Sequence, residues 1–315
     1  MMLARIATLA VATLALAHQP LAAQPKAPAW SLDTRGDLSA FLDCMEAEKH
    51  TIISAHRGGP TPGLPENAIE TMDALLHAAP AIMEVDVAQS SDGVLFLLHD
   101  DTLDRTTTGT GEAAAQAWKE LEALHLRDPA GWTTPYRIPT LDAALEWAKG
   151  RTMLQIDFKR SASYEKTVAA IREADMAHSV ILIAYSLDGA RQLHALAPEM
   201  MISLSMDSLA SLEEAVSAGI PSDRLVAFTG IRMPRPELYA ALDEADVEVI
   251  FGTLGGRDSI DSLIADFGME ERYVELGAAG VDIIATDRPR EAAVALARAE
   301  RLPEDGTCGF TRRSR

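Results

Sequence analysis

Short apolar runs alternate with longer amphipathic stretches along most of the chain. Eight runs have the length and composition of buried strands: residues 51–56, 82–87, 153–159, 180–186, 201–206, 225–229, 247–253 and 282–286. Eight stretches with apolar residues at helical spacing follow them, at residues 68–78, 141–148, 163–174, 188–197, 208–218, 236–244, 259–276 and 289–300. This α/β alternation predicts a (β/α)8 TIM barrel in one domain. A doubly wound open sheet shows the same alternation, but the count of eight favours the barrel.

One segment interrupts the alternation. Residues 94–99 form an extra apolar run, and residues 100–139 are too long for an ordinary strand-to-helix loop and include a short helical stretch at 118–124. We therefore expect a small insertion after the second strand, at about residues 100–139, lying over the mouth of the barrel. The barrel itself is expected to occupy residues 50–300, with a tail at residues 301–315.

The first residues read as a targeting segment. One basic residue, Arg5, precedes the apolar run 6–17, and a small-residue cleavage site ends at Ala23. This pattern predicts a signal peptide at residues 1–23, because the apolar run is too short to act as a membrane anchor. We expect a periplasmic or secreted protein without stable membrane insertion after cleavage. Residues 24–49 then form an arm, irregular as far as residue 31 and helical over 38–49.

The chain has two cysteines, Cys44 and Cys308, one near each end of the expected mature protein. In an exported protein an even count of cysteines indicates a disulfide, although two unrelated thiols remain the alternative. A bridge that closes so long a loop stabilises by about 4–5 kcal/mol in the chain-entropy model. It would connect the N-terminal arm to the C-terminal tail.

Composition and charge limit the possible ligands. The chain has 315 residues, of which 48% are hydrophobic, and a formal net charge of −19. Nucleic acid is excluded as a partner because binding of its phosphate backbone requires a basic surface. A small anionic substrate would need a local cation, supplied by a metal ion or by a few arginines and lysines.

Carboxylates collect at the ends of two predicted strands. Glu84 and Asp86 are two residues apart and share one face of their strand, and Asp157 and Lys159 share one face of another. If both faces point into the barrel, three carboxylates meet and repel one another unless a cation neutralises them. All-oxygen ligation favours Ca²⁺ or Mg²⁺ over Zn²⁺. The alternative is ordinary ion pairing at strand ends.

Two histidines accompany these acids. His56 and His99 each end an apolar run, which suits a general acid and a general base at neutral pH, although a single histidine there is more often structural. The planar guanidinium of Arg57 could bind a phosphate through two hydrogen bonds. The alternative interpretation of Arg57 is an ion pair at the barrel rim. Gly58 and Gly59 allow a tight turn.

Two further polar positions have a structural interpretation as helix caps. Asn67 directly precedes a predicted helix and is as well explained by capping as by function. The pair Thr286–Asp287, which precedes Pro289, also favours a helix cap over a ligand.

These motifs together resemble the glycerophosphodiester phosphodiesterase family. The resemblance rests on His-Arg-Gly, Pro-Glu-Asn, Glu-x-Asp-Val, Ser-Asp-Gly, His-Asp, Arg-Thr-Thr-x-Gly-x-Gly, Ile-Pro-Thr-Leu, Asp-x-Lys and Thr-Asp-Arg-Pro, in this order over residues 50–295. It implies a barrel with a small insertion, a divalent cation on Glu84, Asp86 and Asp157, and His56 and His99 as the acid–base pair. Arg57 and Lys159 would contact the phosphate of a small-molecule glycerophosphodiester substrate.

The implied reaction releases glycerol phosphate and an alcohol through a cyclic phosphate. A glycerol hydroxyl attacks phosphorus, one histidine takes its proton, the other protonates the departing alcohol, and water then opens the ring. One alternative is head-group cleavage of lysophospholipids by cyclisation on the same barrel, and another is a non-catalytic exported binding protein.

The chain departs from the family pattern at two places. Asp157 stands where the family usually has Glu, which has one methylene more. The segment 251–255 reads Phe-Gly-Thr-Leu-Gly where the family usually has Trp and then Asn, close to the expected glycerol pocket.

Overall fold

The computed structural model describes residues 29–34 and 36–313, so the expected signal peptide and residues 24–28 lie outside the described residues. Eight parallel strands close into a barrel, which confirms the predicted TIM barrel. They are β2 (Ile52–Ala55), β3 (Ile82–Gln89), β7 (Leu154–Phe158), β8 (Val180–Ala184), β9 (Met201–Ser205), β10 (Leu225–Phe228), β11 (Glu248–Gly252) and β12 (Ile283–Thr286). Closure comes from β2, which pairs with β12 on one side and β3 on the other.

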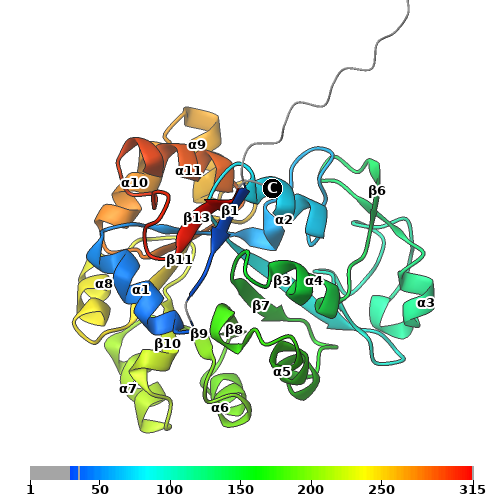
Figure 1. Ribbon diagram of the computed structural model, residues 1–315, viewed down its shortest axis with the longest axis horizontal. Helices are drawn as coiled ribbons and strands as arrows, with labels where there is room; N and C mark the ends of the chain where they lie inside the picture. Colours follow the sequence, from blue (N-terminus) through cyan, green and yellow to red (C-terminus); the bar gives the residue numbers. More distant parts are fainter. Residues whose placement is uncertain (1–28, 35, 314–315) are drawn as a thin grey trace, which may run out of the picture.

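Helices surround the barrel (Figure 1). They are α2 (Ile69–Leu76), α4 (Leu141–Ala148), α5 (Tyr164–Glu173), α6 (Leu187–Leu196), α7 (Leu209–Ser217), α8 (Pro236–Asp243), α9 (Ile260–Phe267), α10 (Glu271–Ala278) and α11 (Pro289–Arg298), with short 3₁₀ turns at Ala177–Ser179 and Ser222–Arg224. Each buries one apolar face against strands that are themselves almost wholly buried, as a parallel sheet requires. No helix in the described ranges is long and apolar enough to cross a membrane.

The single helix expected over residues 259–276 is wrong. The structure has two helices there, because Gly268 ends α9 in the left-handed conformation at φ 63°. Its N–H donates to the Ile264 carbonyl over 2.8 Å, which closes the last turn of α9, and α10 begins three residues later.

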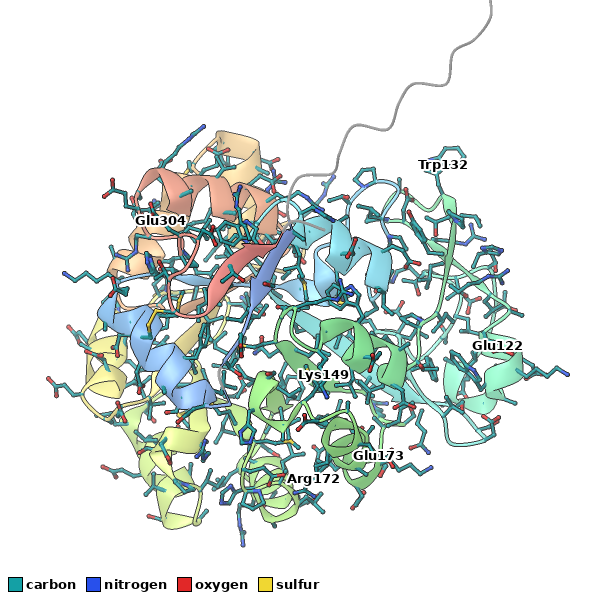
Figure 2. The ribbon with its side chains drawn as sticks, in the orientation of Figure 1. Glu122, Trp132, Lys149, Arg172, Glu173 and Glu304 are labelled. Carbon is teal, nitrogen blue, oxygen red and sulfur yellow. A yellow bond between two sulfur atoms is a disulfide. The ribbon has the colours of Figure 1, made fainter. Side chains whose placement is uncertain are left out.

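The insertion after β3 is a small unit with its own core. Strand β4 (Leu95–Leu97) pairs antiparallel with β3, and the unit continues with a 3₁₀ turn (Ala113–Ala115), α3 (Trp118–Leu121) and the antiparallel pair β5 (His125–Arg127) and β6 (Thr133–Arg137). A separate apolar cluster holds it together, with Phe96, Leu121 and Leu126 at its centre. Trp132 projects from it into solvent and is 75% exposed (Figure 2).

The two ends of the described chain meet against the barrel (Figure 1). Strand β1 (Ala29–Leu32) pairs antiparallel with β13 (Phe310–Arg313), so the irregular arm expected up to residue 31 is corrected for residues 29–31. The short polar–apolar run at residues 29–32 contains no signal for a partner about 280 residues away. Helix α1 (Leu38–Ala47) packs beside this pair and leads into β2.

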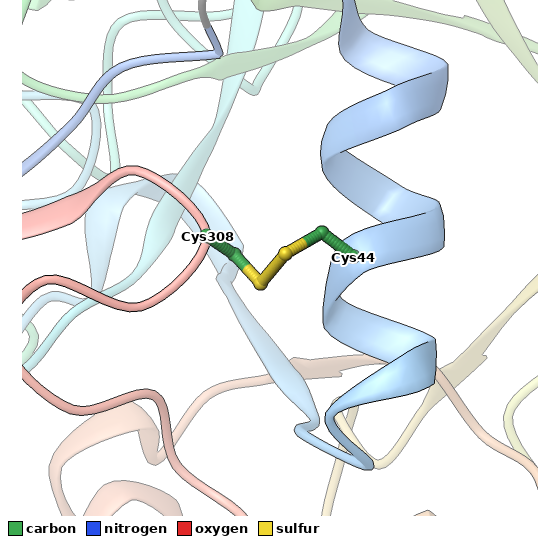
Figure 3. Close-up of a disulfide and its surroundings, with 2 residues drawn as sticks. All are labelled: Cys44 and Cys308. Carbon is green, nitrogen blue, oxygen red and sulfur yellow. A yellow bond between two sulfur atoms is a disulfide. The ribbon is translucent and has the colours of Figure 1, made fainter.

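The predicted disulfide joins Cys44 in α1 to Cys308 in the loop before β13 (Figure 3). The two Cα atoms are 5.8 Å apart, and 264 residues separate the cysteines in sequence. The bridge therefore closes nearly the whole domain into one loop, at the end of the barrel where its strands begin.

We expect the double variant C44S/C308S to lose about 3–5 kcal/mol of unfolding free energy, because the unfolded chain regains the freedom of a very long loop. Urea unfolding of the oxidised wild type, the reduced wild type and the variant measures this loss. Activity at a temperature where both proteins are folded should not change, since the bridge lies at the barrel end opposite the carboxyl ends of the strands. Equal unfolding free energies would show that the β1–β13 pairing alone holds the ends.

Acidic side chains gather where α1 covers the starts of β11 and β12. Burial, followed by repulsion from Asp282, raises the pKa of Glu248 to about 8. Burial also raises the pKa of Asp282 to about 6. A hydrogen bond to Asp243, followed by burial, raises the pKa of Glu46 to about 8. These carboxyls therefore prefer to be neutral in the folded protein.

This cluster predicts that stability falls as pH rises. Folded Glu248 keeps its proton up to a pKa of about 8, whereas the unfolded group releases it near 4.5. Between these two values the folded state binds more protons, so unfolding free energy decreases with pH, by roughly 3–5 kcal/mol for this group. The variant E248Q should match the wild type at pH 5 and exceed it at pH 8 in urea unfolding. Parallel pH profiles for the two proteins would contradict the prediction.

Candidate active site

Three buried carboxylates meet at the carboxyl ends of two neighbouring strands. In the β3–β7 pair, Asp86 lies opposite Asp157, and Glu84 lies one pleat below Asp86 on the same face. One oxygen of each carboxylate lies within 4.8 Å of the others, and each residue is at most 7% exposed. Burial, followed by repulsion from Asp86, raises the pKa of Glu84 to about 8. The alternation of the strand thus brings together the three acids that the sequence singled out.

The cluster has the properties of a site for a hard divalent cation. Its donors are all carboxylate oxygens, and Oδ1 of Asp157 is buried without a hydrogen-bond partner. Such an orphaned oxygen is costly unless a ligand satisfies it. The raised pKa of Glu84 also points to a missing cation, since three adjacent negative charges repel one another unless a counter-charge is present. The residues therefore fit Ca²⁺ or Mg²⁺ by donor type.

Lys159 supplies part of that counter-charge. Its ammonium lies 2.6 Å from Oδ1 of Asp86 and 2.7 Å from Oδ2 of Asp157. Burial opposes the charge on Lys159, but attraction to Asp86 and Asp157 outweighs it and raises the pKa of the lysine. Burial likewise opposes the charge on Asp86, but Lys159 outweighs it and lowers the pKa of this carboxyl. The structure thus places Lys159 between two carboxylates at the edge of the cluster.

Arg57 belongs to a strained turn directly above Glu84. The 3₁₀ turn His56–Gly58 has Arg57 at φ 52° and Gly58 at φ 78°, in the left-handed region that costs energy for a residue with a side chain. This turn aims the backbone N–H of Arg57 at Oε2 of Glu84, 2.7 Å away. The side chain donates to Glu66 over 3.1 Å, and its Nε, 3.8 Å from Asp86, has no hydrogen-bond partner among the described residues.

His56 is held by an aspartate that sequence reasoning assigned to a helix cap. Nδ1 of His56 lies 2.6 Å from Oδ1 of Asp287, which follows β12 directly, whereas the N-cap of α11 is Arg288. Burial lowers the pKa of His56, but the hydrogen bond to Asp287 and the charge of Glu84 outweigh it and raise the pKa. The cap interpretation of Asp287 is therefore wrong. Pairing to Nδ1 leaves Nε2 as the ring nitrogen available to a substrate.

Buried groups behind Asp287 hold it in place. Its backbone N–H donates to Asp261 over 2.7 Å, and Asp261 also accepts from the Tyr273 hydroxyl over 2.7 Å and from Thr286 over 2.9 Å. The second oxygen of Asp287 accepts the Gly255 N–H over 2.9 Å. This network orients the carboxylate that in turn orients His56.

His99 has a matching partner in the next residue. Its Nδ1 lies 2.7 Å from Oδ1 of Asp100, which also accepts two hydrogen bonds from Arg105 of the insertion, at 2.6 and 2.8 Å. These hydrogen bonds from Arg105 hold the pKa of Asp100 well below its usual range. The guanidinium of Arg105 also makes two hydrogen bonds of 2.8 Å to Glu66, the carboxylate that binds Arg57. Arg105 of the insertion thus connects Asp100, the partner of His99, to Glu66, the partner of Arg57 beside His56.

Asn67 serves the site rather than the following helix. The N-cap of α2 is Ala68, and the Asn67 side chain instead donates to Oδ2 of Asp86 over 2.7 Å and accepts the Asp86 N–H over 3.0 Å. Asn67 takes a left-handed conformation, at φ 58°, to make both contacts. The capping interpretation is corrected, and Asn67 fixes the orientation of Asp86.

A cavity of about 130 Å³ opens beside the carboxylates. Its polar side is formed by His56, Glu84 and Asp157, and its opposite side by apolar residues of β8 to β12, with Tyr185 at the rim. His99 does not line this cavity, and it lies close enough to Asp86 to help lower the pKa of that carboxyl.

Sequence reasoning missed the residues that act through others. Arg105 was visible in the Arg-Thr-Thr motif but had no assigned partner, and Asp261 and Tyr185 carried no motif at all. Asp287 directly follows a predicted strand within the Thr-Asp-Arg-Pro motif, but it was assigned to a helix cap. Some of their partners lie far away in the sequence, as Glu66 does from Arg105 and His56 from Asp287.

The fold and site define a TIM-barrel protein with a buried carboxylate cluster between two histidine–aspartate pairs. The model of the glycerophosphoryl diester phosphodiesterase family matches residues 56–223, which is more than half of the chain, so the chain belongs to this family. A glycerophosphodiester phosphodiesterase of Caldanaerobacter subterraneus subsp. tengcongensis is 30% identical over 161 residues, which are 49% of this chain and 66% of that protein.

Solved structures agree with this assignment. A glycerophosphoryl diester phosphodiesterase of Parabacteroides distasonis is 31% identical, with a TM-score of 0.80 over 90% of this chain and 100% of that chain. A glycerophosphodiester phosphodiesterase of Agrobacterium tumefaciens is 28% identical, with a TM-score of 0.64 over 78% of this chain and 99% of that chain. The resemblance inferred from the sequence motifs is confirmed.

Proposed function

We propose that this protein hydrolyses glycerophosphodiesters to glycerol phosphate and an alcohol, with Ca²⁺ or Mg²⁺ bound by Glu84, Asp86 and Asp157. The observation that carries the proposal is the placement of two histidines, each with Nδ1 on an aspartate, around three buried carboxylates. Names of similar proteins support it, since both the Caldanaerobacter and Parabacteroides relatives are called phosphodiesterases of this substrate class.

In the proposed mechanism His56 and His99 move the protons. A glycerol hydroxyl of the substrate attacks phosphorus as one histidine accepts its proton, and the bond to the departing alcohol breaks as the other histidine protonates that oxygen. The product of this step is a cyclic phosphate, and water opens it with the two histidines in exchanged roles. Asp287 and Asp100 each accept a hydrogen bond from Nδ1 of one histidine. Nε2 of each ring is therefore left free to transfer a proton to or from the substrate.

Cationic side chains of the chain hold the phosphate. Arg57 has an Nε without a hydrogen-bond partner among the described residues, and Lys159 lies at the edge of the carboxylate cluster. Both are placed to contact phosphoryl oxygens, and a cation on the three carboxylates would supply charge neutralisation at phosphorus. Glu66 accepts hydrogen bonds from both Arg57 and Arg105 and so keeps the guanidinium of Arg57 oriented.

The proposed place of action is the periplasm or the exterior of the cell. The apolar segment at residues 6–17 and the disulfide between Cys44 and Cys308 both favour export.

The test is product release from a panel of glycerophosphodiesters with choline, ethanolamine, inositol, glycerol or a longer alcohol as the leaving group. Purified mature protein is assayed with chelator and after addition of Ca²⁺ or Mg²⁺, and phosphorus NMR separates glycerol phosphate from cyclic phosphate. Cation-dependent formation of glycerol phosphate is the expected result. Cyclic phosphate as the final product would instead favour the lysophospholipid-type cyclising reaction, and no turnover by folded protein with cation would refute both.

A further inference from the structure

The apolar side of the cavity contains a buried hydroxyl that the proposed mechanism does not use. Ser203 lies in the middle of β9, lines the same cavity as His56 and Glu84, and is only 1% exposed. No hydrogen bond joins its hydroxyl to another described residue, and the oxygen is not among the fully enclosed unpaired atoms, so it is open to the cavity. A hydroxyl that faces a cavity and has no protein partner is free to bond to a ligand group there.

Ser54 shows the difference within the same barrel. It is also buried and lies on β2, across the barrel from β9, but its Oγ donates to Oε1 of Gln155 over 2.7 Å. The hydroxyl of Ser54 thus has a hydrogen-bond partner within the protein, whereas the hydroxyl of Ser203 has none among the described residues.

A second hydroxyl lies above the first. Ser205 is two residues further along β9, so it shares the inward face of Ser203 and lies nearer the mouth, where it also lines the cavity. The residues beside the pair are apolar, because Ile183 lies opposite Ser203 in the β8–β9 pairing and Phe228 lies opposite Ser205 in the β9–β10 pairing. Ile250, next to Phe228, continues this wall.

We propose that Ser203 and Ser205 form the subsite for the terminal hydroxyl of the glycerol moiety, the one that does not attack phosphorus. The inference rests on the proposed function and names the residues that would recognise the glycerol moiety of the substrate. The carbon chain of glycerol packs on Ile183, Phe228 and Ile250 while its hydroxyl bonds to the serines. Tyr185, the third hydroxyl of the cavity lining, is 69% exposed, so solvent reaches it without a ligand.

The chemistry of the ligand follows from this arrangement. The attacking hydroxyl must lie near a histidine, whereas the remaining hydroxyl reaches the opposite side of the cavity, where the serines are the hydroxyl groups on β9. A phosphodiester of propane-1,2-diol keeps the attacking hydroxyl and lacks the terminal one, so it should lose the contact with Ser203 and keep the reaction.

The experiment measures dissociation constants by calorimetry, with Ca²⁺ or Mg²⁺ present, for sn-glycerol 3-phosphate, 2-hydroxypropyl phosphate and inorganic phosphate. Wild type should bind glycerol phosphate about tenfold more tightly than 2-hydroxypropyl phosphate, the difference that one hydrogen bond typically makes. In S203A and in S203A/S205A this preference should disappear, while the constants for the other two ligands stay within twofold of wild type. S203C, which keeps the size of the side chain, should behave as S203A does.

S217A is the matched control, because it removes an exposed hydroxyl at the end of α7, outside the cavity. It should keep the preference for glycerol phosphate. A preference that survives in S203A, or a loss of affinity that is equal for all three ligands, would overturn the subsite and leave the proposed function intact. If folded, cation-loaded wild type bound none of the three ligands, both the subsite and the proposed function would be refuted.

Discussion

Replacing either His56 or His99 with alanine is expected to lower kcat for glycerophosphodiester hydrolysis by about 10²–10⁴-fold, the range typical of lost general acid–base catalysis. Each ring presents Nδ1 to an aspartate, at 2.6 Å for His56 and 2.7 Å for His99, so each has one nitrogen left for proton transfer. The double variant H56A/H99A should lose little more than the worse single variant, since both proton transfers belong to one step.

The same variants should leave cation binding and the fold unchanged. Cation-dependent shifts in Tm, measured for wild type and each variant, test this. His77, the C-cap residue of the outer helix α2, serves as the control, because H77A removes a histidine outside the candidate site and should retain activity. Full activity in H56A and in H99A would refute the acid–base assignment.

Removal of the cation is expected to have the second large effect. Chelation should lower kcat by at least about 10³-fold, since the phosphoryl group would face three carboxylates without charge neutralisation. Addition of Ca²⁺ or Mg²⁺ should restore the activity. E84Q and D157N should reproduce the loss and weaken cation affinity, while E213Q, which neutralises an exposed acid on α7, should do neither.

The pH dependence of cation binding gives an independent measurement. Without cation the pKa of Glu84 is raised to about 8, so a cation must displace a proton below that pH. Affinity in calorimetry should therefore rise with pH and level off above about 8, and D86N should weaken this dependence because Asp86 is the main charged neighbour of Glu84. Cation affinity that is independent of pH would contradict the assignment of Glu84 as a ligand.

Asp157 provides a further comparison. Its side chain is one methylene shorter than the Glu usual in the family; Lys159 donates to it over 2.7 Å, and Tyr185 lines the same cavity. D157E tests whether these two neighbours have adapted to the shorter side chain, in which case the variant binds the cation less tightly than wild type.

The repeated pattern of apolar runs was sufficient to predict the barrel, because a strand buried on both faces needs a continuous apolar stretch whatever its neighbours are. Strand alternation was also sufficient to place Glu84 and Asp86 on one face, and Asp157 on the corresponding face of another strand. Errors arose where a single residue changes the backbone, as at Gly268, and where a strand depends on a distant partner, as with β1 and β13.

The functional residues divide in the same way. The sequence by itself determined the fold class, the three carboxylates, the two histidines and the disulfide pair, because local periodicity, residue chemistry and recognisable motifs carry that information. Only the tertiary structure decided that Asp287 binds His56, that Arg105 joins Asp100 to Glu66, and that Ser203 faces the cavity without a partner. These facts depend on which side chains the closure of the barrel brings within hydrogen-bond distance, and residues separated by up to 231 positions leave no local pattern of that contact.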